Sequence, residues 1–338
     1  MVPRPDFVVS QATAKEAQTL YYEWPRELHW NPGRNGNDME QVFYPLYPEA
    51  FRVGRLSVTA AANDNNGSST SSKPVSTLLA IQYSDSLGFI AINVVDEAYR
   101  GQGLGLLAFK DAMKRFHPQA IVALDSAVEQ VENYKKSGFV HVAWDNVRSD
   151  IAIDHLLENA TSSKLQQHQV IEIGQVSLEE LVRVEKQYAG FDRPKFVARW
   201  QAYHTDSADQ HRFGVAVLAQ DNKTVLGYGA IRPGVEAYKV GPLYASDDAV
   251  ATAILKALGE RVLEASKSRP LTTAAGVVDP VVLRMEVDIP DANKQGTQLL
   301  WDVLGFKEMI RTVRMWAGPA PPAVQVSGLY GVCSLEGG

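Results

Sequence analysis

The chain has 338 residues, more than one ordinary domain needs, so its length predicts two domains. With 45% hydrophobic and 21% charged residues it has the composition of a folded globular protein, and its formal net charge of -6 argues against a nucleic-acid partner, because phosphate contacts require clustered cations. The single cysteine, Cys333, excludes an intramolecular disulfide.

The lack of long apolar runs bears on the cellular compartment of the protein. Residues 1–10 contain no apolar core of signal-peptide length, and no later stretch is as long as a membrane span. Together with the cysteine count, this predicts a cytoplasmic protein without a membrane partner.

The N-terminal half is predicted to form strands and helices around one sheet. A strand at Phe7–Ser10 and an amphipathic helix at Ala12–Trp24 come first, and a loop rich in Trp, His, Asn, Pro and Gly follows at 25–38. A polar, low-complexity run at 61–73 predicts a hairpin loop. The further strands of this half are predicted at 50–60, 75–83, 87–95, 121–124 and 139–144.

A glycine-rich turn at Tyr99–Gly105 separates the strand 87–95 from a helix that reaches Phe116. Apolar residues of that helix recur at spacings of three and four, so one of its sides faces a core. A second helix is predicted at 129–137, closed by Gly138.

The second half of the chain repeats this plan after a linker predicted at 156–168. Two related copies of one α/β fold, at 1–155 and 169–338, are the economical interpretation. Strands of the second copy are predicted at 170–173, 215–220, 226–232, 238–243 and 285–289, and helices at 178–188, 248–265 and 293–304.

The glycine-rich turn carries the sharpest chemical signal. Arg100, Gly101, Gln102, Gly103, Leu104 and Gly105 lie between a buried strand and a helix, where backbone N–H groups and the helix dipole can hold a pyrophosphate. A tight turn that binds nothing is the alternative. A dinucleotide-binding turn would need an acidic residue about 20 positions on, and Asp125 is only loosely placed for it.

The pattern Arg100-x-x-Gly103-x-Gly105 resembles the acetyl-CoA pyrophosphate loop of the GNAT superfamily of N-acetyltransferases. The segment Tyr134–Phe139, with its tyrosine one helical turn before Gly-Phe, is similar to the second signature of that superfamily. The resemblance implies two GNAT folds in tandem, each a mixed, mostly antiparallel sheet flanked by helices. It also implies acetyl-CoA, or another acyl-CoA, as co-substrate and no metal.

The resemblance further implies roles for individual residues. Val94 and Val95 would offer backbone groups to the pantetheine arm and the thioester carbonyl, and residues 100–105 would hold the pyrophosphate. Tyr134 would protonate the departing CoA thiolate, since that leaving group needs a proton or a close donor. In the second copy Trp301 stands in the place of Tyr134 and no Arg-x-x-Gly-x-Gly pattern occurs, so we expect one cofactor site.

The loop 25–38 borders the acceptor pocket in the superfamily. Trp24, Trp30, Asn31 and Asp38 are therefore candidates for binding the substrate, and Glu23, His29 and Asp38 are candidates for the base. Each has a structural alternative, because Glu23 can be solvated, His29 can cap a turn and Asp38 can cap the helix that follows.

Three functions remain compatible with these motifs. The favoured one is direct transfer of acetyl from acetyl-CoA to a primary amine of a small metabolite or amino acid. Acetylation of a protein or peptide is the first alternative, and binding of acyl-CoA without turnover is the second. The acceptor, the acyl chain length and the oligomeric state do not follow from the sequence.

Overall fold

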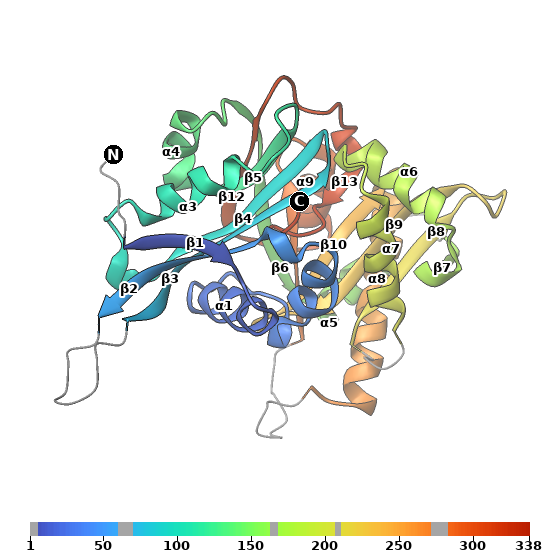
Figure 1. Cartoon of the computed structure of the whole chain (residues 1–338). Coiled ribbons are helices and arrows are strands. Elements are labelled where there is room, and N and C mark those ends of the chain that lie inside the picture. Colours follow the sequence, from blue (N-terminus) through green and yellow to red (C-terminus); the bar gives the residue numbers. More distant parts are fainter. Residues whose placement is uncertain (1–5, 60–69, 163–167, 207–210, 272–282) are drawn as a thin grey trace. The chain divides into compact units, whose positions relative to one another are not determined.

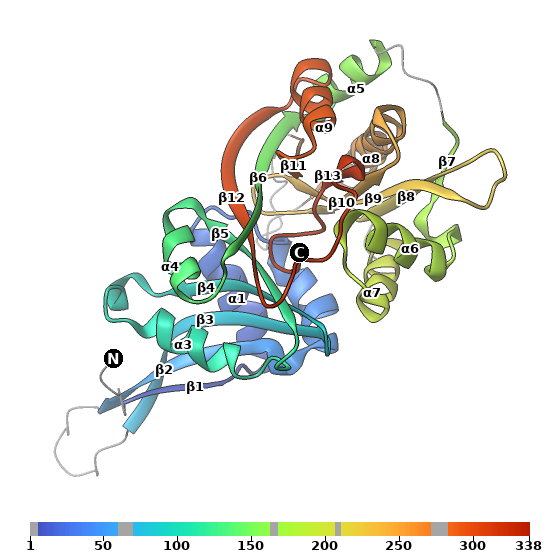
Figure 2. The same cartoon turned by 90° about the horizontal axis from the view of Figure 1, so that it is seen from above.

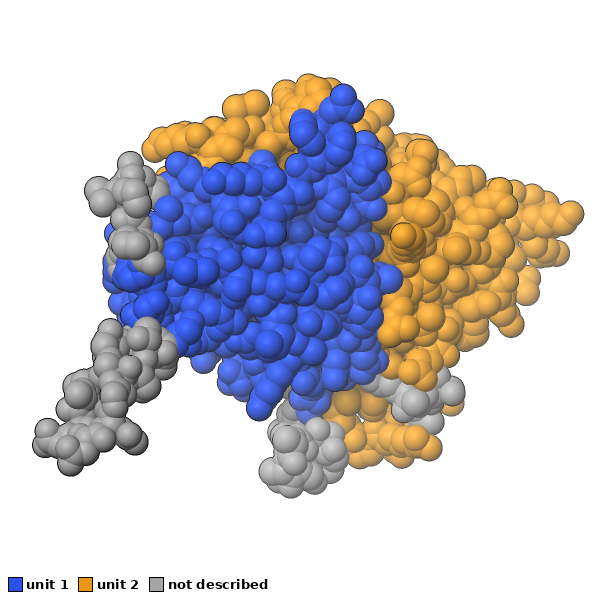
Figure 3. Space-filling view, viewed as in Figure 1, with its two compact units in different colours: residues 1–120 blue, residues 121–338 orange. Residues whose placement is uncertain are grey.

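The computed structural model describes residues 6–59, 70–162, 168–206, 211–271 and 283–338. The chain divides into two compact units, Met1–Ala120 and Ile121–Gly338, which are coloured separately in Figure 3. Most of the predicted hairpin loop 61–73 lies outside the described residues.

The first unit is an antiparallel sheet with helices on both faces. Helices α1 (Ala14–Glu27) and α3 (Leu104–Met113) lie on opposite faces of the sheet (Figures 1 and 2), and the short α2 spans Tyr44–Leu46. Each strand pairs with the next in the order β1 (Phe7–Gln11), β2 (Phe51–Thr59), β3 (Thr70–Ser84) and β4 (Leu87–Val95).

Helix α1 begins at Ala14, two residues after its predicted start at Ala12, because Thr13 and Glu16 form a capping box. The Thr13 hydroxyl accepts from the Glu16 N–H at 3.2 Å, and the Glu16 carboxylate accepts from the Thr13 N–H at 2.9 Å. The helix runs to Glu27, beyond its predicted end at Trp24, with the ring of Pro25 buried inside it. The predicted loop 25–38 therefore starts later, at Leu28.

The second unit holds a larger, mostly antiparallel sheet. Among the described pairings, β10 (Tyr238–Ala245) and β11 (Arg284–Pro290) alone are parallel. A short strand, β13 (Leu329–Gly331), pairs with β10 outside the main strand order. The main order is β5 (Ile121–Ala127), β12 (Lys307–Ala317), β6 (His141–Ala152), β11 (Arg284–Pro290), β10 (Tyr238–Ala245), β9 (Val225–Pro233), β8 (Phe213–Leu218) and β7 (Val170–Glu172).

Strand alternation gives this sheet one apolar and one polar face. Val147 and Val287 belong to a core cluster that includes residues of α5 (Ile153–Ser162), of α8 (Asp248–Ser268) and of the helical turn Leu299–Val303, whereas their neighbours Arg148 and Asp288 point the other way. The helices of this unit are α4 (Val131–Lys136), α5 (Ile153–Ser162), α6 (Leu178–Ala189), α7 (Pro194–Thr205), α8 (Asp248–Ser268) and α9 (Lys294–Gln298).

The predicted fold class is confirmed, but several elements differ from the prediction. Helix α7 and strand β12 were not predicted. The segment 156–168, expected as a linker, begins inside α5, which buries Leu156 and Ala160. Strands β5 and β6, from the predicted N-terminal domain, pair with β12, so the compact units divide at residue 120 rather than 155.

Candidate functional site

The turn after β4 is held together by short local bonds. The Asp96 carboxylate accepts from the Ala98 N–H at 3.0 Å and starts the single turn Glu97–Tyr99. The Arg100 Nε donates to the Val95 carbonyl at 3.0 Å, so the side chain of Arg100 ties the turn to the end of the strand.

Glycines leave the beginning of α3 open. Gly101 and Gly103 have φ of 77° and 76°, in the left-handed region that other residues rarely adopt, and a Cβ at either position would meet no atom within 4 Å. Gly103 is the N-cap of α3 and provides no side chain to bond the first-turn N–H groups. Gly105 sits against β4, since its Cβ would lie 3.0 Å from Val95 Cγ2. The geometry suits an anion.

A bulge interrupts β4 just before the turn. Thr77 pairs with Val94 and Leu79 pairs with Ala91, so β4 has one more residue than β3 between these pairs. Ile92 adopts a φ of 47°, which a β-branched residue adopts only under strain, and its carbonyl accepts from the Thr77 hydroxyl at 3.2 Å. Strained backbone of this kind concentrates at functional sites. The bulge sets the path of Val94 and Val95.

Tyr134 lies in the second unit, near the end of α4. The helix ends there because the Tyr134 carbonyl accepts from the Ser137 and Phe139 N–H groups, at 2.9 and 3.0 Å, and Gly138 takes a φ of 100°. The half-buried ring of Tyr134 meets that of Phe139 edge to face, with centroids 6.1 Å apart. The Gly-Phe pair of the motif therefore fixes the position of the tyrosine ring.

The predicted acceptor residues fall into two groups by exposure. Glu23, His29 and Trp30 are exposed, whereas Asn31 and Asp38 are each 1% exposed. The Asp38 carboxylate accepts from the Met39 N–H at 2.9 Å, as the capping alternative predicts.

The loop is also shaped around these residues. The Asp38 carboxylate lies where a Cβ on Gly33 would be, so that only glycine fits at position 33. His29 and Asn31 take φ of 56° and 49°, and Trp24 on α1 is half-buried. The strained backbone agrees with a functional loop but assigns no base.

The corresponding helix start in the second unit is closed. After β10, the N-cap of α8 is Asp247, whose carboxylate accepts from the Val250 N–H at 3.0 Å. The next residue, Asp248, accepts from the Tyr330 hydroxyl at 2.7 Å. Carboxylates thus stand where α3 has open glycines, and they would repel a phosphate. Trp301, at the position corresponding to Tyr134, donates to the Ser149 hydroxyl at 3.0 Å.

The polar face of the second sheet carries buried ion pairs that the sequence reasoning missed. Arg148 donates to both carboxylate oxygens of Asp288, at 2.9 and 3.0 Å, and lies 3.5 Å from the Glu286 carboxylate. Burial alone would lower the pKa of Arg148, but the two carboxylates raise it above its ordinary value. The alternation of polar and apolar residues in β6 and β11 is the sequence signal that could have predicted these ion pairs.

Glu336 lies in a second buried cluster on this face. Its carboxylate accepts from the Lys239 ammonium at 2.9 Å and lies 3.9 Å from the Arg232 guanidinium. Burial raises the pKa of Glu336, but the two cations outweigh burial and lower the pKa to about 2. Nearby on β10, the Tyr238 hydroxyl lies 2.9 Å from His211 Nδ1.

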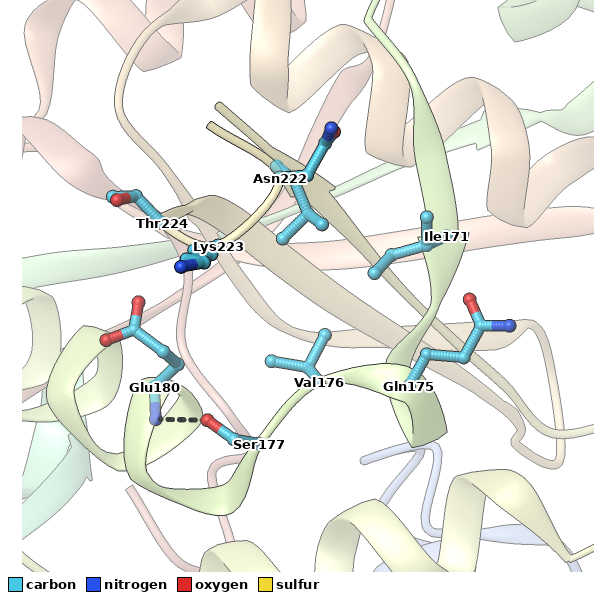
Figure 4. A pocket seen from close by; sticks show the side chains of 9 residues that line it. Ile171, Gln175, Val176, Ser177, Glu180, Asn222, Lys223 and Thr224 are labelled. Atoms are coloured by element: carbon cyan, nitrogen blue, oxygen red, sulfur yellow. Dashed lines mark hydrogen bonds between the residues drawn. The ribbon is translucent and has the colours of Figure 1, made fainter. Parts of the chain in front are cut away.

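A separate hollow of about 390 Å³ opens beside the start of α6, and none of the predicted site residues lines it (Figure 4). Its polar side chains are engaged locally: Ser177 accepts from the Glu180 N–H, and the Glu180 carboxylate accepts from the Val225 N–H at 3.1 Å. The described residues contain no group of three His, Cys, Asp or Glu side chains arranged for a metal ion. Every described helix is too short or too polar to cross a membrane.

Known proteins resemble this chain in sequence and in fold. A family model described as an acetyltransferase (GNAT) domain matches residues 181–266. The holothin acyltransferase of Pseudoalteromonas sp. (strain SANK 73390) is 24% identical over 327 residues, which cover 97% of this chain and 93% of that protein.

Two solved structures share the fold over nearly the whole chain. One is described as an acetyltransferase from Pyrococcus horikoshii; it has 17% identity and a TM-score of 0.67, and the match covers 100% of this chain and 98% of that one. The other is a tandem GNAT protein from the clavulanic acid biosynthesis pathway, with 11% identity and a TM-score of 0.55, covering 93% of this chain and 100% of that one.

Proposed function

Because the chain belongs to the GNAT superfamily of acyltransferases, we propose that it transfers acetyl from acetyl-CoA to a primary amine of a small metabolite or amino acid. The amine nitrogen attacks the thioester carbonyl carbon and forms the amide bond while the carbon–sulfur bond breaks. The thiolate gains one proton and the attacking nitrogen loses one, so the products are the acetylated amine and free CoA.

The open start of α3 is the observation that carries this proposal. Gly101 and Gly103 leave the first-turn N–H groups of the helix without covering side chains, and the helix dipole adds positive potential there. The diphosphate of acetyl-CoA has the charge and the size for such a cradle. Val94 and Val95, beyond the strained bulge, are the proposed backbone contacts of the pantetheine arm.

Tyr134 is the proposed acid for the CoA thiolate. A phenol ordinarily keeps its proton at neutral pH, and a positioned donor contributes about a hundred- to ten-thousandfold to rate. Packing against Phe139 supports the role, because it restricts the orientation of the ring. We assign binding of the acceptor to Trp24, Trp30, Asn31 and Asp38, and Glu23, His29 and Asp38 remain the candidate bases.

The test of the cofactor site compares two substitutions of one residue. Asparagine tolerates a left-handed backbone, so Gly103→Asn and Gly103→Asp have nearly the same shape and differ in charge. A carboxylate about 4 Å from phosphate costs about 4 kcal/mol in a partly screened site, or about a thousandfold in the Kd. Calorimetry with acetyl-CoA should show this loss for Gly103→Asp alone. Equal Kd values for the two variants would contradict the proposed cradle.

The test of turnover is an amine panel with acetyl-CoA and longer acyl-CoA donors, followed by the release of free thiol. Tyr134→Phe keeps the ring and should leave the Kd for acetyl-CoA nearly unchanged while kcat falls by about a hundred- to ten-thousandfold. Unchanged kcat would remove the role of Tyr134. Turnover with peptides but not with small amines would favour the protein-acetylating alternative, and binding without any turnover would favour the non-catalytic one.

A further inference from the structure

The parallel strands β10 and β11 separate after a short stretch of pairing. They pair at Tyr238–Val240 with Met285–Val287, and beyond this β10 pairs instead with the tail strand β13. The tail also reaches β11, since the Val332 N–H donates to the Asp288 carbonyl at 2.9 Å. Residues 329–332 therefore fill the gap between two strands of the same sheet (Figure 2).

The gap fits this particular segment closely. A Cβ on Gly331 would lie 2.6 Å from Val287 Cγ2 and 3.2 Å from Leu243 Cβ, so a side chain at that position has no room. On β10, a Cβ on Gly241 would collide with the carbonyl of Cys333. Leu329 is 1% exposed in the gap. Strand and gap are complementary in shape as well as in backbone hydrogen bonds.

Side chains anchor the tail on both sides of the gap. The Asn293 amide donates to the Leu329 carbonyl at 3.1 Å, and the Tyr330 hydroxyl donates to Asp248 at 2.7 Å. Farther along, Glu336 accepts from Lys239 and the Gly338 carbonyl accepts from Arg193 Nη2 at 3.1 Å.

We infer that the gap between β10 and β11 is a strand-addition site whose occupant is the chain's own tail, 329–332. The site recognises an uncharged extended peptide, through main-chain bonds and a required glycine. Asp247 and Asp248 at the start of α8 keep an anionic ligand such as acyl-CoA out, with or without the tail. This inference rests on the proposed function in one respect: it takes from it that each chain has a single acyl-CoA site.

The test uses the full chain with a protease site inserted between Ala320 and Pro321, where the backbone is exposed. After cleavage and gel filtration, we expect the native tail to stay bound and a Gly331→Val tail to be lost. Ser327→Ala is the matched control, because Ser327 is exposed and contacts Asn293 only through its carbonyl. Retention of both tails, or loss of the native tail, would overturn the inference.

A second measurement does not depend on the folding of a variant chain. Excess labelled peptide 326–338 should replace the native tail in the cleaved protein and keep the amide exchange of Leu243 and Tyr244 at least about tenfold slower than in the tail-free protein. The Gly331→Val peptide should do neither. Equal behaviour of the two peptides would refute the fit.

The stoichiometry of acetyl-CoA separates this inference from the proposed function. It should stay at one for each chain after the tail is removed, and a second equivalent bound at that point would refute the exclusion by Asp247 and Asp248. Absence of any acetyl-CoA binding would contradict the proposed function. The strand-addition site would still be decided by the retention of the tail and by the peptide exchange.

Discussion

Replacing Glu336 with glutamine should destabilise the protein strongly at neutral pH and much less in acid. Glu336 is 7% exposed, and Lys239 and Arg232 lower the pKa of its carboxyl from 4.5 to about 2 against the effect of burial. At about 1.4 kcal/mol for each pKa unit, this lowering is worth about 3 kcal/mol of folding stability. The variant also leaves the two cations buried without their partner.

The sign of the pH dependence follows from the direction of the pKa change. A lowered carboxyl pKa stabilises the folded state fully above about pH 4.5, and this contribution is lost as the pH falls through 4.5 towards 2. The free energies of unfolding of native and Glu336→Gln proteins, from urea denaturation, should differ by about 3 kcal/mol at pH 7 and by about half of that near pH 3.

Glu264→Gln, on an exposed part of α8, is the control and should change stability by less than about 0.5 kcal/mol at either pH. A difference for Glu336→Gln that is the same at pH 7 and pH 3 would refute the electrostatic explanation. The effect would then come from packing or from the conformation of the tail.

Two further predictions concern buried polar groups of the second unit. Asp125→Asn should lower the free energy of unfolding in urea by about 3–5 kcal/mol, because Arg314 donates two hydrogen bonds to that carboxylate at 2.6 and 2.9 Å. Adding Arg314→Met should recover part of this loss, since it removes the unpaired charge. A double variant as unstable as Asp125→Asn would contradict this explanation. Burial lowers the pKa of His204 to about 3, so the native protein should lose stability as the pH falls from about 6.5 towards 3. His204→Phe should remove this contribution to the pH dependence of the free energy of unfolding, because its ring still packs on Trp200 but does not titrate.

Local chemistry explains which elements could be predicted. The capping box of α1, the left-handed glycines before α3 and the helical spacing of apolar residues in α8 each depend on residues within about one or two turns of the chain. Helix α7 carries a similar signal, since Phe196, Trp200 and Tyr203 lie at helical spacing, although no helix is predicted between residues 188 and 215.

Strand β12, in contrast, could not be predicted, because the residues of this segment do not show the alternation that indicates a strand. It carries Lys307, Glu308, Arg311 and Arg314 among apolar residues, and two bulges break its alternation. Its charges are explained only by partners on the neighbouring strands, for example Asp145 on β6 for Arg311 and Asp125 on β5 for Arg314. A charged strand in the interior of a sheet requires such pairing.

Helices such as α3, α6 and α8, together with the glycine-rich turn, can be predicted from the amino-acid order, because a residue's backbone preference and its near neighbours suffice for these. The meeting of Arg148 with Asp288, and the place of the tail between β10 and β11, emerge only from the folded chain. Those contacts join residues about 45 to 140 positions apart, and they form only when the packing of the whole sheet outweighs the entropy of closing such loops.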